Sequence, residues 1–254
     1  MTEINALDLA FVVDTTGSMG NLIGAAQRQM VAMIGEVARS AEVSLRLGVV
    51  EYRDHPPQDR LVFRVHPFTD DLKKAQATIN GLKADGGGDT PESVLDGVLA
   101  ACRDLKWRPH ARRLAVLVGD APPHGVGCGG DGFPRGCPCG ETIDSVTAAA
   151  EEVRVMLYAL GLTHYVTESF GRLSRYTGGE FFAADQGEAA IDRLKAILTA
   201  EFGNLDFDRR VLAEREANPS GTMNETAERL GSSRPAVSAA LSRLGTRGLL
   251  KATL

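Results

Sequence analysis

The sequence has few cysteines and no long hydrophobic run, and both absences narrow the class of protein. Four cysteines in 254 residues are too few for a disulfide framework. The apolar run near the N-terminus, Leu7 to Val13, is interrupted by Asp8 and is far too short to span a bilayer. The N-terminus also lacks a basic segment followed by an apolar core and a small-residue cleavage site. We therefore expect a cytoplasmic protein that makes no membrane contact.

A strong excess of positive charge is also missing. The formal net charge of -5 argues against a surface that binds nucleic acid all over. The average nevertheless hides an asymmetry, because Arg229 to Leu254 contains five basic residues and no acidic one. A small basic end on an acidic body indicates two parts with separate roles. We predict a first domain of residues 1–203 and a second of residues 204–254.

Short β-rich runs alternate with amphipathic helical stretches over the first two hundred residues. This alternation predicts an α/β fold, with a doubly wound, mostly parallel six-stranded sheet covered by helices on both faces. The third strand follows the second after a proline-rich turn and alternates more, so we expect it at the sheet edge, antiparallel. The expected strands are 7–14, 43–52, 60–68, 112–120, 153–162 and 179–184, and the expected helices are 18–40, 70–83, 91–105, 141–151, 165–176 and 187–202.

Acidic and hydroxyl side chains follow two of these strands. Asp14 closes the first strand and is followed by Thr16 and Ser18, Asp120 closes the fourth, and Thr90 lies in a Gly-rich loop before a helix. Singly, each is well suited to cap a helix or turn the chain. Together they would meet at the carboxyl edge of the sheet, where ligands of such folds bind. Two carboxylates and three hydroxyls form an all-oxygen set suited to Mg²⁺, or to Mn²⁺ or Ca²⁺.

These motifs resemble the metal-ion-dependent adhesion site of the von Willebrand factor A (vWA) family. Its pattern is Asp-x-Ser-x-Ser, then a distant Thr and a distant Asp, and this sequence departs from it only in carrying Thr16 for the first Ser. The runs VVDTTGSMG, GGGDTPESVLDG and GDAPPHG resemble the A-type domain that accompanies atypical alpha-kinases, over about residues 5–202. No kinase segment is recognised, so kinase activity is not carried over. The resemblance implies a site whose cation is completed by a carboxylate of a protein partner.

A long Gly/Pro/Cys-rich loop, residues 121–140, follows Asp120. A loop of this length inside a compact domain is usually functional or tied down. Three thiols and an imidazole would satisfy a tetrahedral zinc site, and the candidate ligands are His124, Cys128, Cys137 and Cys139. The irregular Cys-x-Cys spacing leaves two alternatives open. His124 can face the metal crevice, or the loop can be packed by Phe133 and its prolines with free thiols.

The C-terminal segment resembles a helix-turn-helix of the winged-helix regulators. Residues 224–230 would form the positioning helix and residues 234–244 the recognition helix, with Gly231 in the turn. The candidate DNA contacts are Arg234 and Ser238 for base edges and Arg243, Arg247 and Lys251 for phosphates. The segment is so short that it must pack on the body or form a homodimer. A plain docking module is the alternative.

The sequence contains no GxSxG, P-loop or HExxH signature. We therefore predict a metal-dependent binding protein rather than an enzyme, joined to a DNA-binding or docking tail. A co-chaperone or assembly adaptor of an AAA+ ATPase is one alternative. A metal-dependent hydrolase is another, for which His124 is the only nearby candidate base.

Overall fold

Five parallel strands and one antiparallel strand form the central sheet in the computed structural model, which describes residues 3–38, 43–183 and 188–250. In space they follow the order β3-β2-β1-β4-β5-β6, and β3 runs antiparallel to β2 at the edge. The predicted α/β class and the mostly parallel six-stranded sheet are thereby confirmed. The strands are β1 (Ala6–Asp14), β2 (Ser44–Tyr52), β3 (Phe63–Thr69), β4 (Arg112–Gly119), β5 (Met156–Gly161) and β6 (Phe181–Ala183).

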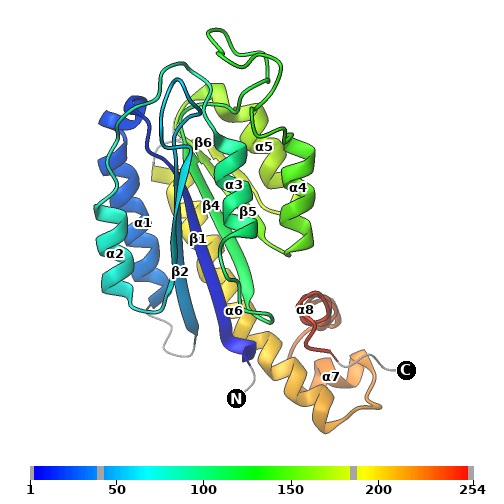
Figure 1. Ribbon diagram of the computed structural model, residues 1–254. Helices are drawn as coiled ribbons and strands as arrows, with labels where there is room; N and C mark the ends of the chain where they lie inside the picture. The colour runs from blue at the N-terminus through cyan, green and yellow to red at the C-terminus, as the bar shows by residue number, and fades with distance from the viewer. Residues whose placement is uncertain (1–2, 39–42, 184–187, 251–254) are drawn as a thin grey trace.

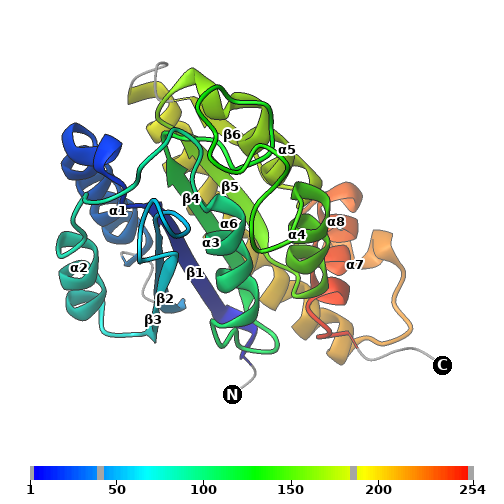
Figure 2. The same ribbon diagram turned by 45° about the horizontal axis from the view of Figure 1, so that its top comes forward.

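Helices cover both faces of the sheet, as Figures 1 and 2 show. Short 3-10 turns at Glu3–Asn5, Gly17–Asn21 and His164–Val166 precede β1, α1 and α5. Two further helices, α7 and α8, lie at the end of the molecule where the chain begins (Figure 1). The helices are α1 (Ile23–Ala38), α2 (Leu72–Asn80), α3 (Val94–Arg103), α4 (Ile143–Glu152), α5 (Thr167–Tyr176), α6 (Glu188–Ala217), α7 (Met223–Arg229) and α8 (Arg234–Thr246).

Alternation along the central strand β1 divides the core into two layers. Phe11 and Val13 belong to the cluster that packs against α1, α2 and α6, whereas Ala10 and Val12 belong to the cluster under α3, α4 and α5. All nine residues of β1 are buried, because a central parallel strand is covered on both faces. The two layers hold the carboxyl end of β1 firmly in place.

Two helix starts differ from the sequence prediction. Helix α2 begins at Leu72 rather than at residue 70, and its cap is Asp71, whose carboxylate accepts hydrogen bonds from the backbone N–H groups of Lys73 and Lys74. Helix α3 begins at Val94 rather than next to Thr90, after Ser93. The Ser93 hydroxyl instead donates to backbone carbonyls of the β2–β3 segment. Thr90 and its neighbours therefore remain a loop beside the sheet edge.

Helix α6 continues through the predicted domain boundary. Its 30 residues run from the sheet into the C-terminal segment, so residues 203 and 204 lie inside one helix rather than in a linker. The second half of α6 supplies Val211 and Leu212 to a small core with Val237 and Leu244 of α8. Ile4, which precedes β1, also belongs to this core. The tail is therefore packed on the body, at the end of the sheet opposite the carboxyl edge (Figure 2).

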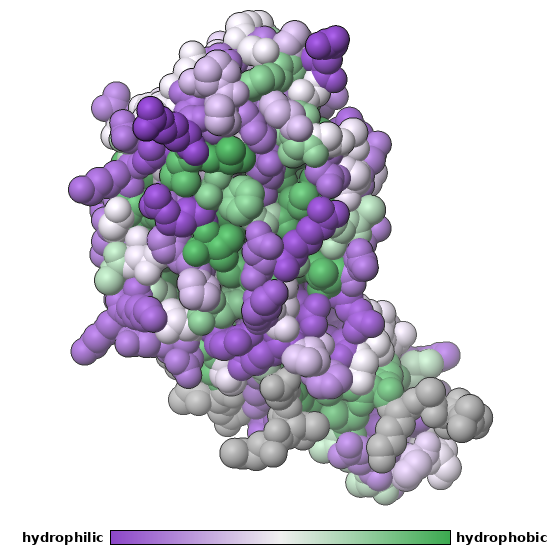
Figure 3. Space-filling view, in the orientation of Figure 1, coloured by the Kyte–Doolittle hydropathy of each residue, from purple (hydrophilic) through white to green (hydrophobic). Residues whose placement is uncertain are grey.

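On the face of Figure 3, hydrophobic residues gather over the middle of the main body and hydrophilic residues surround them. Large exposed hydrophobic side chains belong to separate elements, among them Phe63 on β3 and Tyr176 on α5. Within the described ranges, no helix is both long and apolar enough to cross a membrane.

Candidate functional site

The first candidate site lies at the carboxyl edge of the sheet, where the strand order reverses. β1 is flanked by β2 on one side and β4 on the other, and the crossover connections leave in opposite directions. Asp14 is the last residue of β1, and Asp120 comes directly after β4. In doubly wound folds this reversal opens the crevice in which ligands bind. The sequence prediction placed both carboxylates here.

Four of the five predicted residues form a continuous chain of hydrogen bonds. One oxygen of Asp14, Oδ1, accepts hydrogen bonds from the backbone N–H of Thr16 at 2.9 Å and from its hydroxyl at 2.7 Å. The hydroxyls of Thr16 and Ser18 are 3.1 Å apart, and Ser18 Oγ donates to Asp120 Oδ1 at 3.0 Å. The Asp-x-Thr-x-Ser spacing thus gathers two carboxylates and two hydroxyls around one point.

Thr90, the fifth predicted residue, lies nearby but outside this chain. Its side chain is exposed, and none of the hydrogen bonds between described residues joins it to the other four. Its loop is nevertheless fastened to the site, because Gly17 N–H donates to the carbonyl of Gly86 and Asp85 N–H donates to that of Thr15. The loop that carries Thr90 is therefore held beside the crevice.

Glu92 is a site residue that the sequence analysis missed. Its side chain is 2% exposed, and one carboxylate oxygen, Oε2, has no hydrogen-bond partner among the described residues. Burial, followed by the charge of Asp14, raises the pKa of Glu92 to about 10. Its position two residues after Thr90 in the TPES run was the only available signal, and spacing alone does not show that the carboxylate turns inward.

The electrostatics of the crevice suit a cation. Burial and then the charge of Asp120 raise the pKa of Asp14 to about 7. Asp14 Oδ2 and the hydroxyl of Tyr52 are buried without a hydrogen-bond partner among the described residues. Buried polar atoms are normally paired, so these oxygens mark a place where a positive ion would be stabilised. Carboxylate and hydroxyl oxygens are the ligands that Mg²⁺ accepts, and the residues present therefore fit such an ion.

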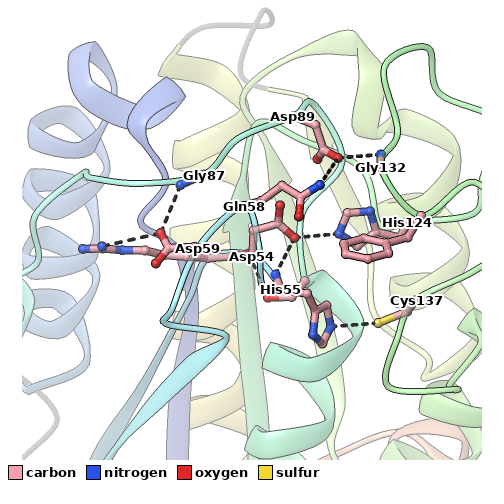
Figure 4. A network of polar contacts seen from close by, with 12 residues as sticks. Asp54, His55, Gln58, Asp59, Gly87, Asp89, His124, Gly132 and Cys137 are labelled. Carbon is pink, nitrogen blue, oxygen red and sulfur yellow. Dashed lines mark hydrogen bonds and ion pairs between the residues drawn. The ribbon is translucent and has the colours of Figure 1, made fainter.

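The loop after β4 gathers a different set of side chains from the predicted zinc ligands. His124 Nε2 is 2.7 Å from Asp54 Oδ1 (Figure 4). Its Nδ1 is 2.9 Å from Asp131 Oδ1, so carboxylates engage both nitrogens. Burial alone would lower the pKa of His124. The hydrogen bonds to the two carboxylates outweigh burial and raise this pKa above its usual range. Cys128 is half-buried, and its thiol contacts the carbonyl of its neighbour Gly129 at 3.7 Å. The predicted set does not come together here.

Cys137 and Cys139 lie close together, but beside side chains other than the predicted ligands. Their sulfur atoms are 2.7 Å apart, and Cys137 Sγ is 3.2 Å from His55 Nε2 and 3.0 Å from Asp96 Oδ2. His55 and Asp96 were not considered as ligands in the sequence analysis. They come from the β2–β3 connection and from the first turn of α3, and no spacing rule relates either to the cysteines.

The candidate DNA contacts of the tail divide into two groups. Arg234 and Ser238 are exposed on α8. Arg243 instead pairs with Asp208 of α6 at 2.6 Å. Arg247 is 5% exposed and donates to the backbone carbonyls of His110 and Ile4. Arg243 thus joins α8 to α6, and Arg247 joins α8 to the body, so neither has its predicted role as a phosphate contact. Lys251 lies outside the described residues.

Two helices separated by a short turn are present in the tail, close to the predicted ranges. Helix α7 is Met223–Arg229 and α8 is Arg234–Thr246, and the Ser233 hydroxyl caps α8. The comparisons with known proteins below give no support for a winged helix-turn-helix identity.

The comparisons concern the first part of the chain. Residues 8–113 match the family model of the von Willebrand factor A domain. The alpha-protein kinase vwkA of Dictyostelium discoideum is 26% identical over 155 residues, which are 60% of this chain and 24% of that protein. The putative ariadne-like RING finger protein R811 of Acanthamoeba polyphaga mimivirus is 29% identical over 129 residues, 51% of this chain and 12% of that protein. The chain thus matches a quarter or less of the length of each of these relatives.

Solved structures show the same fold at low sequence identity. The conserved hypothetical protein BatB from Bacteroides thetaiotaomicron has a TM-score of 0.56 and 12% identity, and the match covers 78% of this chain and 98% of that one. Proximal thread matrix protein 1 from the mussel byssus, solved with a zinc-occupied MIDAS motif, has a TM-score of 0.55 and 14% identity, over 76% of this chain and 46% of that one. At such identities the likeness concerns the fold.

Proposed function

We propose that this chain binds a protein partner through a divalent cation held by Asp14, Thr16, Ser18 and Asp120, with Thr90 on the adjoining loop. The match of residues 8–113 to the family model of the von Willebrand factor A domain supports the proposal. The observation that carries the proposal is the chain of hydrogen bonds that ends on Oδ1 of Asp14, while the other oxygen of that carboxylate, Oδ2, is buried without a hydrogen-bond partner among the described residues. A bound Mg²⁺ would supply an open coordination position for an acidic side chain of the partner. The protein's own residues position the oxygens and hold the crevice open.

Burial and charge support a binding role. The crevice gathers the carboxyl groups of Asp14, Glu92 and Asp120, and burial raises the pKa of the first two, so without a cation these groups offer no positive charge to an acidic partner. Partner binding should therefore depend strictly on the metal. Mn²⁺ and Ca²⁺ offer related oxygen chemistry and belong to the same proposal.

We propose binding rather than catalysis for this site. A metal-dependent hydrolase needs a general base beside the metal. His124, the only candidate that the sequence offered, has both ring nitrogens engaged by Asp54 and Asp131. Neither nitrogen is then free to accept a proton from water, which favours the binding function.

For the tail we propose a docking module rather than a DNA reader. The observation behind this preference is the engagement of Arg243 and Arg247 with Asp208 and with backbone carbonyls of the body. An adaptor of an AAA+ ATPase is one form that such a protein takes. We expect no binding of a labelled mixed-sequence duplex at micromolar protein and low salt. Salt-sensitive binding in an anisotropy titration would restore the DNA hypothesis.

The metal site itself is tested by titration calorimetry with Mg²⁺. Asp14→Ala and Ser18→Ala should lose Mg²⁺ binding while the far-ultraviolet circular dichroism stays unchanged, because neither residue belongs to the hydrophobic clusters that form the core. Asp70→Asn, which alters an exposed carboxylate before α2, is the matched control. An unchanged Mg²⁺ affinity in Asp14→Ala would contradict the site.

The partner chemistry is tested by selection from a displayed peptide library on the immobilised protein in Mg²⁺. We expect peptides that elute when Mg²⁺ is withdrawn and that share an acidic residue, whose change to the amide abolishes binding. Peptides that stay bound without Mg²⁺, or that bind Asp14→Ala equally well, would argue against a partner carboxylate on the metal.

A further inference from the structure

Three segments that are far apart in the sequence bring four metal-binding side chains to one point beside the crevice. His55 follows β2, Asp96 lies in the first turn of α3, and Cys137 and Cys139 belong to the connection between β4 and α4. Each residue offers one ligand atom, and these four atoms all lie within 4.8 Å of one another. Figure 4 shows His55 and Cys137 pointing toward each other from two different loops.

The four side chains are largely withdrawn from water. His55 is 8% exposed, Asp96 7% and Cys137 7%, and Cys139 is half-buried. His55 Nε2 is 3.0 Å from Asp96 Oδ2, and Cys137 Sγ is 3.0 Å from the same oxygen. Two thiols, an imidazole and a carboxylate are an unusual group to bury for packing alone, because polar groups need partners when they are desolvated.

We propose that His55, Asp96, Cys137 and Cys139 form a closed, structural zinc site. Zinc prefers four tetrahedral ligands from cysteine, histidine and acidic residues, and a site with four protein ligands leaves no position for substrate. Ligand atoms around tetrahedral zinc lie roughly 3.3–3.8 Å apart, given bond lengths near 2.0 Å to nitrogen and 2.3 Å to sulfur. The candidate ligand atoms are closer together, at 2.7–3.2 Å. To bind an ion, these side chains must therefore move outward by about 1 Å or less.

This ligand set replaces the one expected from the loop sequence. Only Cys137 and Cys139 are common to both, and His55 and Asp96 take the places of His124 and Cys128. The imidazole of His124 is already held at both nitrogens by carboxylates. The difference provides a direct test, since Cys128→Ser and His124→Ala should spare a site that Cys137→Ser and His55→Ala destroy.

The proposed ion would fasten the long loop to the sheet. Residues 121–140 contain no helix or strand, and seven of these residues are glycine. Zinc would join this loop to the β2–β3 connection at His55 and to α3 at Asp96, four residues after Glu92. Metal binding contributes folding energy when the unfolded chain has no preformed site. The zinc site would thus stabilise the wall of the crevice without entering it.

Ligand chemistry separates the two sites. The crevice offers oxygen atoms, which suit Mg²⁺, whereas thiolates and imidazole select zinc. We therefore expect the purified protein, expressed with zinc available, to carry about one tightly held zinc ion per chain, measured by inductively coupled plasma mass spectrometry. Asp14→Ala should keep this ion while losing Mg²⁺ binding, so failure of one site does not imply failure of the other.

The variants establish which side chains bind the ion. Cys137→Ser and His55→Ala should lose the zinc, whereas Cys128→Ser, the matched thiol control, and His124→Ala should keep it. Because the first two variants can fail to fold, the wild type is also reconstituted with Co²⁺. A tetrahedral cobalt spectrum with a thiolate charge-transfer band is expected, and its loss of intensity on adding Zn²⁺ would confirm a shared site.

Three results would overturn the proposal. The first is wild-type protein without zinc after expression in zinc-supplemented medium. The second is a disulfide between Cys137 and Cys139 in freshly purified protein, detected by intact mass with and without reductant. The third is loss of zinc in Cys128→Ser together with its retention in His55→Ala, which would restore the ligand set expected from the sequence.

Discussion

Replacing Asp14 by Asn should stabilise the metal-free protein while abolishing its response to Mg²⁺. The Asp14 carboxylate is fully buried, and its pKa is raised to about 7 by burial and by the charge of Asp120. Its Oδ1 already accepts two hydrogen bonds from Thr16, which an amide oxygen can also accept. Asn therefore removes a buried charge and leaves the existing hydrogen bonds in place.

The size of the effect follows from the pKa. The rise from the ordinary value of 3.8 to about 7 is roughly 3 units, and at about 1.4 kcal/mol per unit it corresponds to an upper limit of about 4 kcal/mol. Since water and mobile ions entering the crevice screen part of this energy, we expect Asp14→Asn to raise the free energy of unfolding by about 1–3 kcal/mol.

The sign of the pH dependence is fixed by the direction of the shift. The folded protein binds the Asp14 proton more tightly than the unfolded chain, so wild-type stability without metal falls as the pH rises from the ordinary pKa through about 7. The advantage of Asp14→Asn should therefore be largest above neutrality and should disappear toward about pH 4.

Urea unfolding at about pH 8 tests this prediction, with and without Mg²⁺. Mg²⁺ is removed by gel filtration rather than by a chelator, so that tightly bound zinc stays in place. A cation at 100 times its dissociation constant adds about 2.7 kcal/mol to wild-type stability, and Asp14→Asn should gain almost nothing. Asp70→Asn is the control. A variant that is less stable than wild type without metal, or equally stabilised by Mg²⁺, would refute the reasoning.

Three further predictions concern other parts of the molecule. Burial alone would raise the pKa of Glu51, but His66 and Arg64 lower this pKa below its ordinary value. The ionised Glu51 side chain therefore stabilises the fold at a pH above its ordinary pKa, and this stabilisation is lost as the pH falls through its pKa in the folded protein. Glu51→Gln should cost about 1 kcal/mol at neutral pH and almost nothing near pH 3 in urea unfolding; an equal cost at both would contradict this. Arg247→Met leaves buried carbonyls unpaired and should cost about 2–4 kcal/mol, with faster release of the tail in limited proteolysis; unchanged cleavage would count against the anchor. Thr90→Ala should change the free energy of unfolding by less than about 0.5 kcal/mol and weaken Mg²⁺ binding less than Asp14→Ala in calorimetry; an equal loss would show that its hydroxyl reaches the ion.

The metal crevice was largely predictable because two of its residues end buried parallel strands. Strand direction and hydrophobic continuity alone place Asp14 and Asp120 at the same edge, whatever the loops do. Glu92 escaped prediction because its inward turn depends on a backbone bridge to Pro123. A contact between two loops leaves no periodic pattern in either of them.

The cysteine loop shows the same limit. Proximity in sequence grouped Cys128 with Cys137 and Cys139, but the loop path separates Cys128 from them and brings His55, which lies 82 residues before Cys137, into contact. Ligands supplied by distant segments cannot be chosen from spacing.

The tail arginines were misplaced for a related reason. A basic residue on a short helix is expected to be exposed, unless a buried acid faces it. Arg243 meets Asp208, which is 35 residues away and 1% exposed on α6. Arg243 and Asp208 come together because α6 continues without a break through Gly203. This continuity was not predicted, since a glycine inside a helical pattern weakens the prediction of a long helix.

The two ends of β1 keep two surfaces of the molecule apart. Asp14 closes the strand at the crevice, while Ile4, just before its first residue, packs into the core of the tail. Nine residues of strand span about 30 Å, and α6, at 30 residues, is a rod of about 45 Å along the same body. A macromolecule seated at one pole therefore does not compete for space with one seated at the other. The chain has the geometry of a spacer that can hold two bodies at once, at a separation set by its own sheet.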